Sequence, residues 1–270
     1  MTSPATARTR RDWVVLISIG LAAGFLSGFL GVGGGTIIVP ALTALLAFDQ
    51  RLAAGTSLAA IIPPAIVGVI GYVLTGSVNW IAGLILIAGA IVGAWIGSWL
   101  LSKLPLLVLR WMFIVFLLGV AVSLFLAVPS RDAEVDITAL TSLMLVALGL
   151  ITGIISGLIG VGGGVILVPA LMLLFGSSDL EAKGTSLLVM IPTTITGTFG
   201  NAKRGNVDLK AAAAIGLTAA LTSLVGVWCA VLVDPWLGSI LFGAYLLFIA
   251  GQNAFKTIKA QRAAKQAPAA

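Results

Sequence analysis

The sequence predicts an all-α polytopic membrane protein made of two inverted five-segment repeats, with helices broken at glycine-rich motifs. Three observations predict this fold class. Charged residues make up 9% of the chain and apolar residues 60%, whereas soluble domains carry about 25% charged residues. Apolar stretches of about 20 residues, long enough to cross a bilayer as helices, follow one another along the chain. A glycine-rich motif occurs at the same place in each half.

The apolar stretches are predicted to be helices. The run from 84 to 94 is apolar on every face, whereas strands of an outer-membrane barrel alternate apolar and polar residues. Helices then remain as the structure that satisfies its own backbone inside a bilayer. The expected segments are 13–31, 36–48, 53–75, 79–101 and 106–128, repeated at 137–160, 165–176, 182–200, 208–232 and 236–255. The second segment of each unit is short for a full span, at roughly 20 Å.

These segments give the domain organisation. The chain divides into an N-terminal tail (1–12), a first transmembrane repeat (13–128), a linker (129–136), a second transmembrane repeat (137–255) and a C-terminal tail (256–270). Basic residues before the first segment imitate the start of a secretory signal peptide. Because that segment recurs after Asp136, we interpret it as a retained helix. The single cysteine, Cys229, excludes an internal disulfide and a cysteine metal cluster.

An internal repeat relates the two halves. Shifting the chain by 129 residues aligns 24–42 with 153–171, and thirteen of these nineteen positions are identical. Without a gap, the same shift superposes Gly-Thr-Ser at 55–57 on 184–186, and Pro63 on Pro192. Apolar composition alone does not produce shared Ser, Thr and Pro at irregular spacing. We therefore infer a duplicated unit.

The Lys and Arg residues predict orientation, because they concentrate on the cytoplasmic side of a membrane. If every segment reverses sidedness from a cytoplasmic N-terminus, thirteen of the 15 lie inside, and only Arg131 and Lys183 lie outside. Treating the first two segments of each unit as one span gives eleven against four. The odd count places the units upside down relative to each other, as in many secondary transporters. Charge does not distinguish ten full spans from fewer spans with two re-entrant hairpins.

The glycine breaks are candidate anion-binding sites. Val-Gly-Gly-Gly at 32–35 and 161–164 interrupts a helix where no polar loop intervenes. Glycine costs about 1 kcal/mol per residue in a helix interior, so three in succession end the helix. The next half-helix, beginning near Thr36 or Val165, offers unpaired N–H groups and a positive dipole end to an anion. At membrane depth such groups face protein or a water-filled cavity.

A polar pair follows each break, at 56–57 and 185–186. These hydroxyls either donate to the same anion or cap helix starts. The third segment of the second unit is also rich in Thr, which indicates either a lined pathway or interhelical hydrogen bonds. The residues predicted to bind substrate are Gly33, Gly34, Gly35, Thr36, Thr56, Ser57, Gly162, Gly163, Gly164, Thr185, Ser186, Thr193 and Asn201.

Prolines and further glycines have structural interpretations. Pro63, Pro64 and Pro192 lie inside the third segments, where they are expected to kink the helix and leave backbone carbonyls unpaired. Glycines at 68, 89, 93 and 97 have the spacing of close helix contacts, and we interpret them as packing positions.

Residue types and context exclude other classes of function. A phosphate-binding P-loop ends in Lys followed by Ser or Thr, whereas the first break continues as Thr36-Ile37. Asp49 has the spacing of a dinucleotide-binding acid, but no strand-turn-helix unit surrounds it and the duplicate has Ser178. The chain has no histidine and its acids lie near segment ends, so we expect no catalytic residue, metal or cofactor. The net charge of +6 indicates no nucleic acid, because no aromatic-interleaved basic stripe exists.

The doubled motif resembles the sulfite exporter TauE/SafE family, also called the 4-toluene sulfonate uptake permease family. The residues that carry the resemblance are Gly-Phe-Leu-Gly-Val-Gly-Gly-Gly-Thr-Ile-Ile-Val-Pro at 28–40, the copy at 157–169, and the Gly-Thr-Ser after each. It covers nearly the whole chain. The resemblance implies a carrier of sulfite, sulfonates or related sulfur anions in the bacterial inner membrane, for which eight spans are often quoted. It does not fix the substrate.

Together, the residues and the resemblance predict a secondary transporter, an exporter by family inference, for a small sulfur oxyanion. Two inverted units are expected to rock around one central site, with both termini cytoplasmic. No acid or base is expected at mid-membrane, so a side-chain proton relay is not expected. The expected partners are the anion and the lipid bilayer, without nucleic acid, and the oligomeric state is left open. The alternative is a passive anion channel or a non-transporting membrane scaffold.

Overall fold

The computed structural model describes residues 8–126 and 137–266. In these ranges the chain forms ten α-helices, five in each predicted repeat, and short turns join the helices within each five. The helices are α1 (Arg10–Leu30), α2 (Gly35–Leu45), α3 (Gln50–Leu74), α4 (Trp80–Leu100), α5 (Leu106–Leu126), α6 (Ala139–Ile159), α7 (Gly164–Phe175), α8 (Asp179–Ala202), α9 (Leu209–Leu232) and α10 (Pro235–Gln266).

The helices match the ten predicted segments, with several ends displaced. Helix α3 begins three residues early because Asp49 caps it, its Oδ1 accepting from the N–H groups of Arg51 (2.9 Å) and Leu52 (3.0 Å). Helix α8 likewise begins at Asp179, after the cap Ser178. Helix α10 continues to residue 266, eleven residues beyond its predicted end, through a stretch rich in the strong helix formers Ala, Lys and Gln.

The prolines do not interrupt the third helix of either unit. Helix α3 contains Pro63 and Pro64, and α8 contains Pro192, and each is a single helix. The carbonyl of Pro64 accepts a hydrogen bond from the Ser223 hydroxyl of α9, 2.8 Å away. The expected kink at these positions stays a prediction.

Six of the described helices are long and apolar enough to cross a membrane, by length and composition: α1, α3, α4, α6, α9 and α10. Helix α8 is as long as these, but it carries an acidic first turn and many polar residues. The apolar helices α2 and α7 have 11 and 12 residues, which corresponds to about 16–18 Å at the helical rise. They are too short to cross a hydrocarbon core of about 30 Å.

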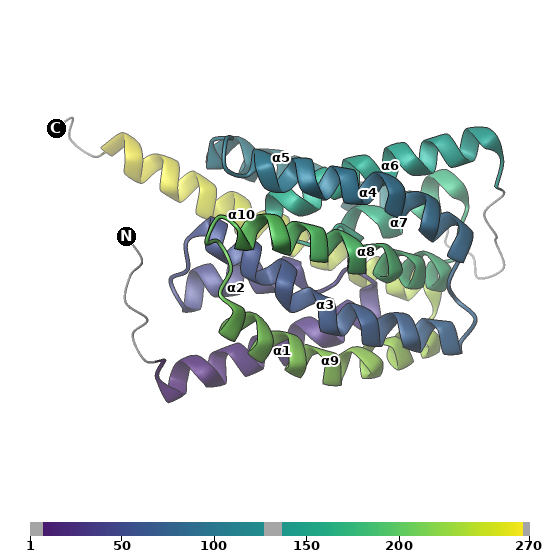
Figure 1. Cartoon of the computed structure of the whole chain (residues 1–270), viewed down its shortest axis with the longest axis horizontal. Helices are drawn as coiled ribbons and strands as arrows, with labels where there is room; N and C mark the ends of the chain where they lie inside the picture. The colour runs from purple at the N-terminus through teal and green to yellow at the C-terminus, as the bar shows by residue number, and fades with distance from the viewer. Residues whose placement is uncertain (1–7, 127–136, 267–270) are drawn as a thin grey trace.

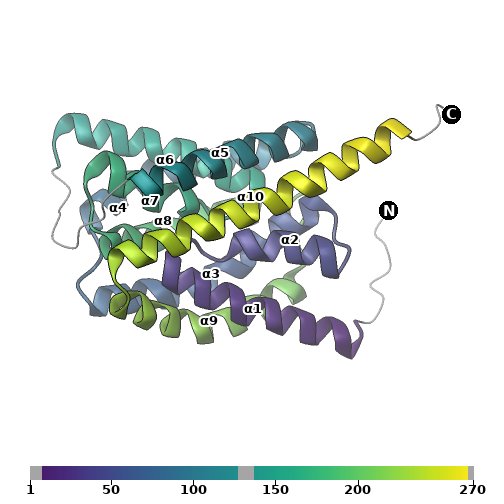
Figure 2. The ribbon, with the colours of Figure 1, turned by 180° about the vertical axis from the view of Figure 1, so that it is seen from behind.

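The two units exchange helix contacts. Helix α1 of the first unit packs along α9 of the second, and α6 of the second packs along α4 of the first (Figure 2). Helix α3 of the first unit also packs against α9 of the second, and α8 of the second packs against α4 of the first. Two helices pack against their own counterparts: α3 against α8, and α5 against α10. Corresponding helices therefore make corresponding contacts across the interface between the units.

Glycines let the exchanged pairs approach closely. A Cβ placed on Gly93 of α4 would lie 2.2 Å from the carbonyl oxygen of Leu150, and one on Gly97 would lie 2.2 Å from that of Ile154. Helix α1 meets α9 in the same way, since a Cβ on Gly24 would lie 2.0 Å from the oxygen of Ala219. The prediction that the glycines at 89, 93 and 97 are packing positions is confirmed.

One end of the bundle collects the start of α1, the end of α10 and three turns between helices. The two helix ends lie on the left in Figure 1. Arg8, just before α1, forms an ion pair with Asp208, which caps α9. The α2–α3 turn, the end of α4, the start of α5 and the last third of α10 surround one cavity. We call this side the basic end, because most of the Lys and Arg residues of the described chain belong to these segments.

Candidate functional site

The two glycine breaks contact each other inside the bundle. A Cβ on Gly35 would lie 2.7 Å from Val161 Cα, and one on Gly164 would lie 2.5 Å from the carbonyl oxygen of Gly31. Either methyl group would therefore overlap the backbone of the opposite break. We call residues 31–35 and 160–164 together the glycine crossing.

The backbone of the crossing requires glycine. In each break the first, third and fourth positions have left-handed φ angles, which cost other L-residues roughly 1–2 kcal/mol. The residues and angles are Gly31 (70°), Gly33 (75°), Gly34 (72°), Gly160 (80°), Gly162 (89°) and Gly163 (89°). The first of them ends the preceding helix, and the last caps α2 or α7 without a side-chain hydrogen bond. Two half-helices thus begin at the crossing, each one residue before its predicted start.

Two apolar side chains fill the space around the crossing. Ile61 of α3 and Met190 of α8 occupy corresponding positions of the repeat, and both are fully buried. A Cβ on Gly33 would lie 2.0 Å from the Met190 methyl carbon, and one on Gly162 would lie 2.2 Å from it. The side chains of Ile61 and Met190, here called the apolar plug, therefore pack against both breaks in this conformation.

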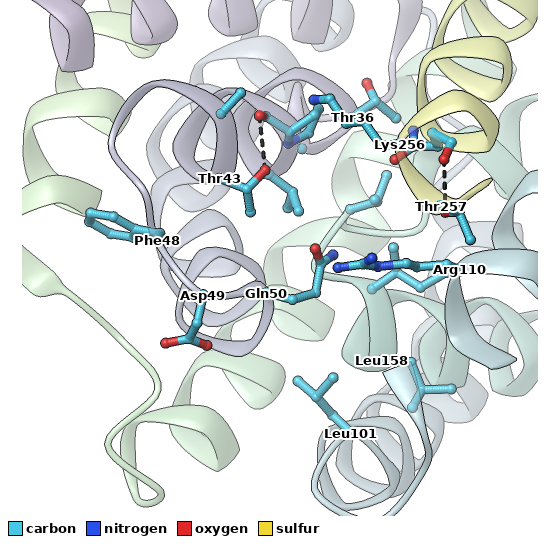
Figure 3. A pocket seen from close by; sticks show the side chains of 17 residues that line it. Thr36, Thr43, Phe48, Asp49, Gln50, Leu101, Arg110, Leu158, Lys256 and Thr257 are labelled. Atoms are coloured by element: carbon cyan, nitrogen blue, oxygen red, sulfur yellow. Dashed lines mark hydrogen bonds between the residues drawn. The ribbon is translucent and has the colours of Figure 1, made fainter. Parts of the chain in front are cut away.

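A cavity of about 460 Å³ reaches the crossing from the basic end (Figure 3). Gly35, Thr36 and Val161 bring the crossing into its wall, and the remainder comes from α2, the α2–α3 turn, α5, α10 and the ends of α4 and α6. The polar lining residues are Thr36, Thr43, Asp49, Gln50, Arg110, Asn253, Lys256 and Thr257. The amides of Gly35 and Thr36 donate to no acceptor in the part of the chain that the structure describes, as expected for a first helical turn.

The charge in this cavity is mainly positive. Arg110 of α5 and Lys256 of α10 are half-buried, and neither has a carboxylate oxygen within 4 Å among residues 8–126 and 137–266. Arg110 extends across the cavity toward Gln50, whereas the carboxylate of Asp49 points away from it (Figure 3). The cavity therefore suits an anion.

The hydroxyls after each break do not cap their own helices. Thr56 lies in the second turn of α3, and its oxygen accepts the N–H of Asp208, the cap of α9, at 3.0 Å. Thr185 of α8 does the same for Asn79, the cap of α4, at 2.9 Å. The capping interpretation is thus corrected: each Thr supports a helix start in the other unit.

The serine beside each Thr lies at the crossing. Ser186 donates to the carbonyl of Gly31 at 3.0 Å, whereas its counterpart Ser57 is buried with no partner in the described residues. The side-chain hydroxyls of Ser27 and Ser156, one turn before each break, are also buried without a hydrogen-bond partner in the described residues. These last two occupy corresponding positions in the repeat and were not among the predicted site residues, although the aligned motif contains both.

The polar residues of α8 are not among the residues that line the cavity. Thr193 and Thr194 donate to the carbonyls of Val189 (2.6 Å) and Met190 (2.7 Å) in their own helix. Asn201 is fully buried and donates to the carbonyl of Gly197 at 2.9 Å. These bonds stay within α8, because Thr side chains inside helices readily donate to the carbonyl four residues earlier. The lined pathway along α8 stays a prediction.

The predicted substrate-binding residues therefore fall into those that line the cavity and those that do not. Gly35 and Thr36 line the cavity, and the other predicted glycines build the crossing behind it. Sequence reasoning missed the cavity's cations, because it took Arg110 and Lys256 for topology signals. It also missed Tyr245 of α10, whose hydroxyl is hydrogen-bonded to that of Thr36. The duplicate has Val165 at the position of Thr36, so this bond has no counterpart.

A buried ion pair lies in the first turns of α8. Lys183 Nζ is 3.2 Å from Asp179 Oδ2, with 7% and 3% of the two side chains exposed. The ammonium also lies 5.9 Å from the centre of the Phe29 ring, near the first break. Beside it, Asn79 donates to Glu181 at 2.7 Å. The expectation that acids lie near segment ends holds for Asp179, but its burial was not foreseen.

Comparison with known proteins identifies the family. The model of the family described as "Sulfite exporter TauE/SafE" matches residues 2–124 and 145–270. The chain is similar to the "Probable membrane transporter protein YunE" of Bacillus subtilis, with 29% identity over 220 residues, 73% of this chain and 81% of the relative. It is 32% identical over 199 residues to a "Probable membrane transporter protein" of Xylella fastidiosa, covering 71% of this chain and 72% of the relative.

The comparison with solved structures found no match. The two matched segments of the family model fall on either side of the predicted linker and contain one glycine break each. The family and the relatives are membrane transporters by description. The chain therefore belongs to the sulfite exporter TauE/SafE family of membrane transporters.

Proposed function

We propose that this membrane transporter is a secondary carrier that exports a small sulfur-containing oxyanion, such as sulfite or an organosulfonate, by alternating access. The observation that carries the proposal is the cavity that ends on Gly35 and Thr36 at the glycine crossing. Its wall offers free amide N–H groups and two cations, which are donors suited to an oxyanion. The cavity approaches the crossing from one end, as expected for one state of a carrier.

The proposed mechanism is a rocking of two inverted units, 13–128 and 137–255, around the crossing. The reciprocal contacts of α1 with α9 and of α6 with α4 support it, because such exchange is typical of a two-fold relation. Many transporters place such an axis in the membrane plane, with broken helices at the centre. In this conformation the apolar plug closes the crossing, so transport requires Ile61 and Met190 to separate from the glycines.

We place the basic end in the cytoplasm and the chain in the bacterial inner membrane. Under this assignment the tails 1–12 and 256–270 are cytoplasmic, and the linker 129–136 lies outside. Helices α3, α4, α5, α8, α9 and α10 would be the full spans, and α1 with α2 and α6 with α7 would form two re-entrant hairpins. For an anion, a negative cytoplasm favours export by about 2.3 kcal/mol per charge per 100 mV.

Anion flux in proteoliposomes tests the function. Purified protein is reconstituted, and uptake of sulfite, thiosulfate and a panel of sulfonates is measured over a range of concentrations. A carrier gives saturable flux for at least one of these anions. Flux of none of them would refute the carrier, and rates that rise without saturation would identify the passive channel instead.

Two variants separate a carrier from a scaffold. Gly34→Leu places a side chain at a left-handed φ, with its Cβ 2.5 Å from the Ala23 carbonyl oxygen, and Thr185→Val removes the bond to Asn79. A scaffold that still inserts into the membrane keeps its function in both variants, whereas a carrier loses anion flux in both. Membrane insertion of each variant, measured by extraction and size-exclusion chromatography, is the control.

Cysteine labelling tests the inverted arrangement. Gly76 and Gly205 are corresponding residues with no neighbour within 4 Å of an added Cβ, so a cysteine at either is accessible. In a background without Cys229, an impermeant reagent should label the two sites from opposite faces of the membrane. Labelling of both from one face would show that the units are parallel.

A further inference from the structure

We propose that Arg110 and Lys256 form an anion-loading site that prefers oxyanions with two negative charges. The proposal rests on the proposed transport function and names the substrate class. The two residues come from α5 and α10, which pack against each other as corresponding helices of the two units. Both side chains line the cavity that leads to Thr36 (Figure 3).

The two positive charges of the cavity favour binding of a dianion. Two positive charges share a partly buried space, and their mutual repulsion grows as water is excluded. Asp49 is the one acid among the lining residues, and its Oδ1 is already engaged by two amides at the start of α3. A doubly charged anion between Arg110 and Lys256 neutralises both cations, whereas a singly charged anion leaves one uncompensated.

Most hydroxyl hydrogens in the wall are already engaged. Thr43 donates to the carbonyl of Pro40 at 3.0 Å, and Thr257 donates to that of Asn253 at 2.8 Å. The hydroxyls of Thr36 and Tyr245 are bonded to each other, which leaves one O–H of this pair to donate to an anion. The charged donors are the cations: the guanidinium fork matches two oxygens of an oxyanion, and the ammonium acts as a point charge.

The size of the cavity favours a small, partly hydrated ion. A volume of about 460 Å³ corresponds to roughly fifteen waters at about 30 Å³ each. A tetrahedral or pyramidal oxyanion fits together with several bridging waters, which preserve most of its hydration. Binding in this cavity then removes little water from the anion. The free-energy cost of desolvation arises later, when the anion enters the glycine crossing.

The loading site has no equivalent in the duplicated unit. The residue that corresponds to Arg110 is Ser239, and position 256 corresponds to Ala127. Residues 31–35 and 160–164 are identical, so both sides of the crossing have the same sequence, but the approaches to it differ in charge. We therefore expect a lower apparent KM for transport that starts at the basic end than for transport in the reverse direction.

The test compares dianions with a monoanion in two neutralised variants. Arg110→Gln and Lys256→Gln are purified, and their Kd values for thiosulfate, sulfate and methanesulfonate are measured by isothermal titration. The matched control is Lys103→Gln, which removes an exposed cation at the same end, outside the cavity, over the Trp99 ring. Arg110→Lys keeps the charge and tests whether charge or the guanidinium fork is required.

We expect each Gln variant to raise the Kd for the dianions by about tenfold or more, the effect of losing one charged hydrogen bond. The Kd for methanesulfonate should rise less, and Lys103→Gln should change neither. Equal loss for dianion and monoanion, or unchanged dianion binding, overturns the loading site while wild-type flux still supports the carrier. If the wild type neither binds nor transports any of these anions, both proposals fail. If a Gln variant misfolds, wild type and Arg110→Lys are compared instead. The proposal is then overturned if neither of these folded proteins binds the dianions more tightly than methanesulfonate.

Discussion

Replacing Gly164 by alanine tests whether the glycine crossing is the moving part of the transporter. Gly164 is the first residue of α7 and has no left-handed φ, so alanine is allowed by its backbone. An isolated helix would gain up to about 1 kcal/mol from this change. In the crossing, however, the new methyl would lie 2.5 Å from the Gly31 oxygen and 2.7 Å from Val32 Cα. Both of these atoms are backbone, so neither can rotate away.

The magnitude follows from the overlap. A carbon and a carbonyl oxygen approach to about 3.3 Å, so the two breaks would have to separate by roughly 0.8 Å. Overpacking of this kind costs about 1–3 kcal/mol. Less the full gain in helix propensity, we expect Gly164→Ala to destabilise by up to about 2 kcal/mol. For a chain of this size that lowers Tm by up to about 8 °C.

The control separates function from stability. Gly176 ends α7 with a φ of 68° and has nothing within 4 Å of an added Cβ. Gly176→Ala should cost a comparable 1–2 kcal/mol through backbone strain alone. Thermal unfolding in detergent and saturable flux in proteoliposomes are measured for both variants.

We expect similar Tm values and a selective change in the flux of Gly164→Ala. A wedge that changes the energy of the closed contact by about 1.4 kcal/mol changes a rate tenfold, whereas Gly176→Ala should keep its flux within about twofold. If the flux of the two variants falls equally, or if Gly164→Ala transports like the wild type, the crossing is packing and the transport path lies elsewhere.

Two further predictions concern the buried polar contacts of α8. Thr185→Val leaves the N–H of Asn79 without its acceptor and should cost about 1–3 kcal/mol in thermal unfolding, whereas Thr185→Ser should retain most of the stability; an unchanged Tm for the valine variant would contradict the cap across the units. Lys183→Met leaves the carboxylate of Asp179 buried without this partner and should destabilise by about 3–5 kcal/mol. A Tm for Lys183→Met equal to that of the wild type would show that the ion pair is dispensable.

Much of the fold was predictable from the sequence, because its signals are local. Apolar run lengths fixed ten segments, and Asp49 and Ser178 are ordinary helix caps whose recognition would also have corrected the starts of α3 and α8. The spacing of Gly93 and Gly97 predicted close packing, which the contacts with α6 confirm. The partner helix was not predictable, since the spacing describes one face and not its neighbour.

The site was only partly predictable, because its key relations are long-range. The breaks were recognised from consecutive glycines, but no pattern in one break indicates that Gly35 lies against Val161. A Lys or Arg near a helix end gives the same sequence pattern in two situations. It marks the cytoplasmic side of the membrane, and it also lines a cavity if its side chain faces the interior of the bundle. Arg110 and Lys256 therefore could not be distinguished from Lys103 before the packing of α5 and α10 was known.

Duplication explains why the site combines symmetry with asymmetry. A repeated backbone gives two half-helices that begin at one point, and glycines that both units need are identical. Positions that need not match have diverged: Thr36 faces Val165 in the alignment, and Ile61 corresponds to Met190. A carrier whose two faces were identical would present equal affinity on both sides. Any difference between the two sides in loading must therefore arise from the diverged positions, and Arg110 and Lys256 are the two among them that place a positive charge in the cavity.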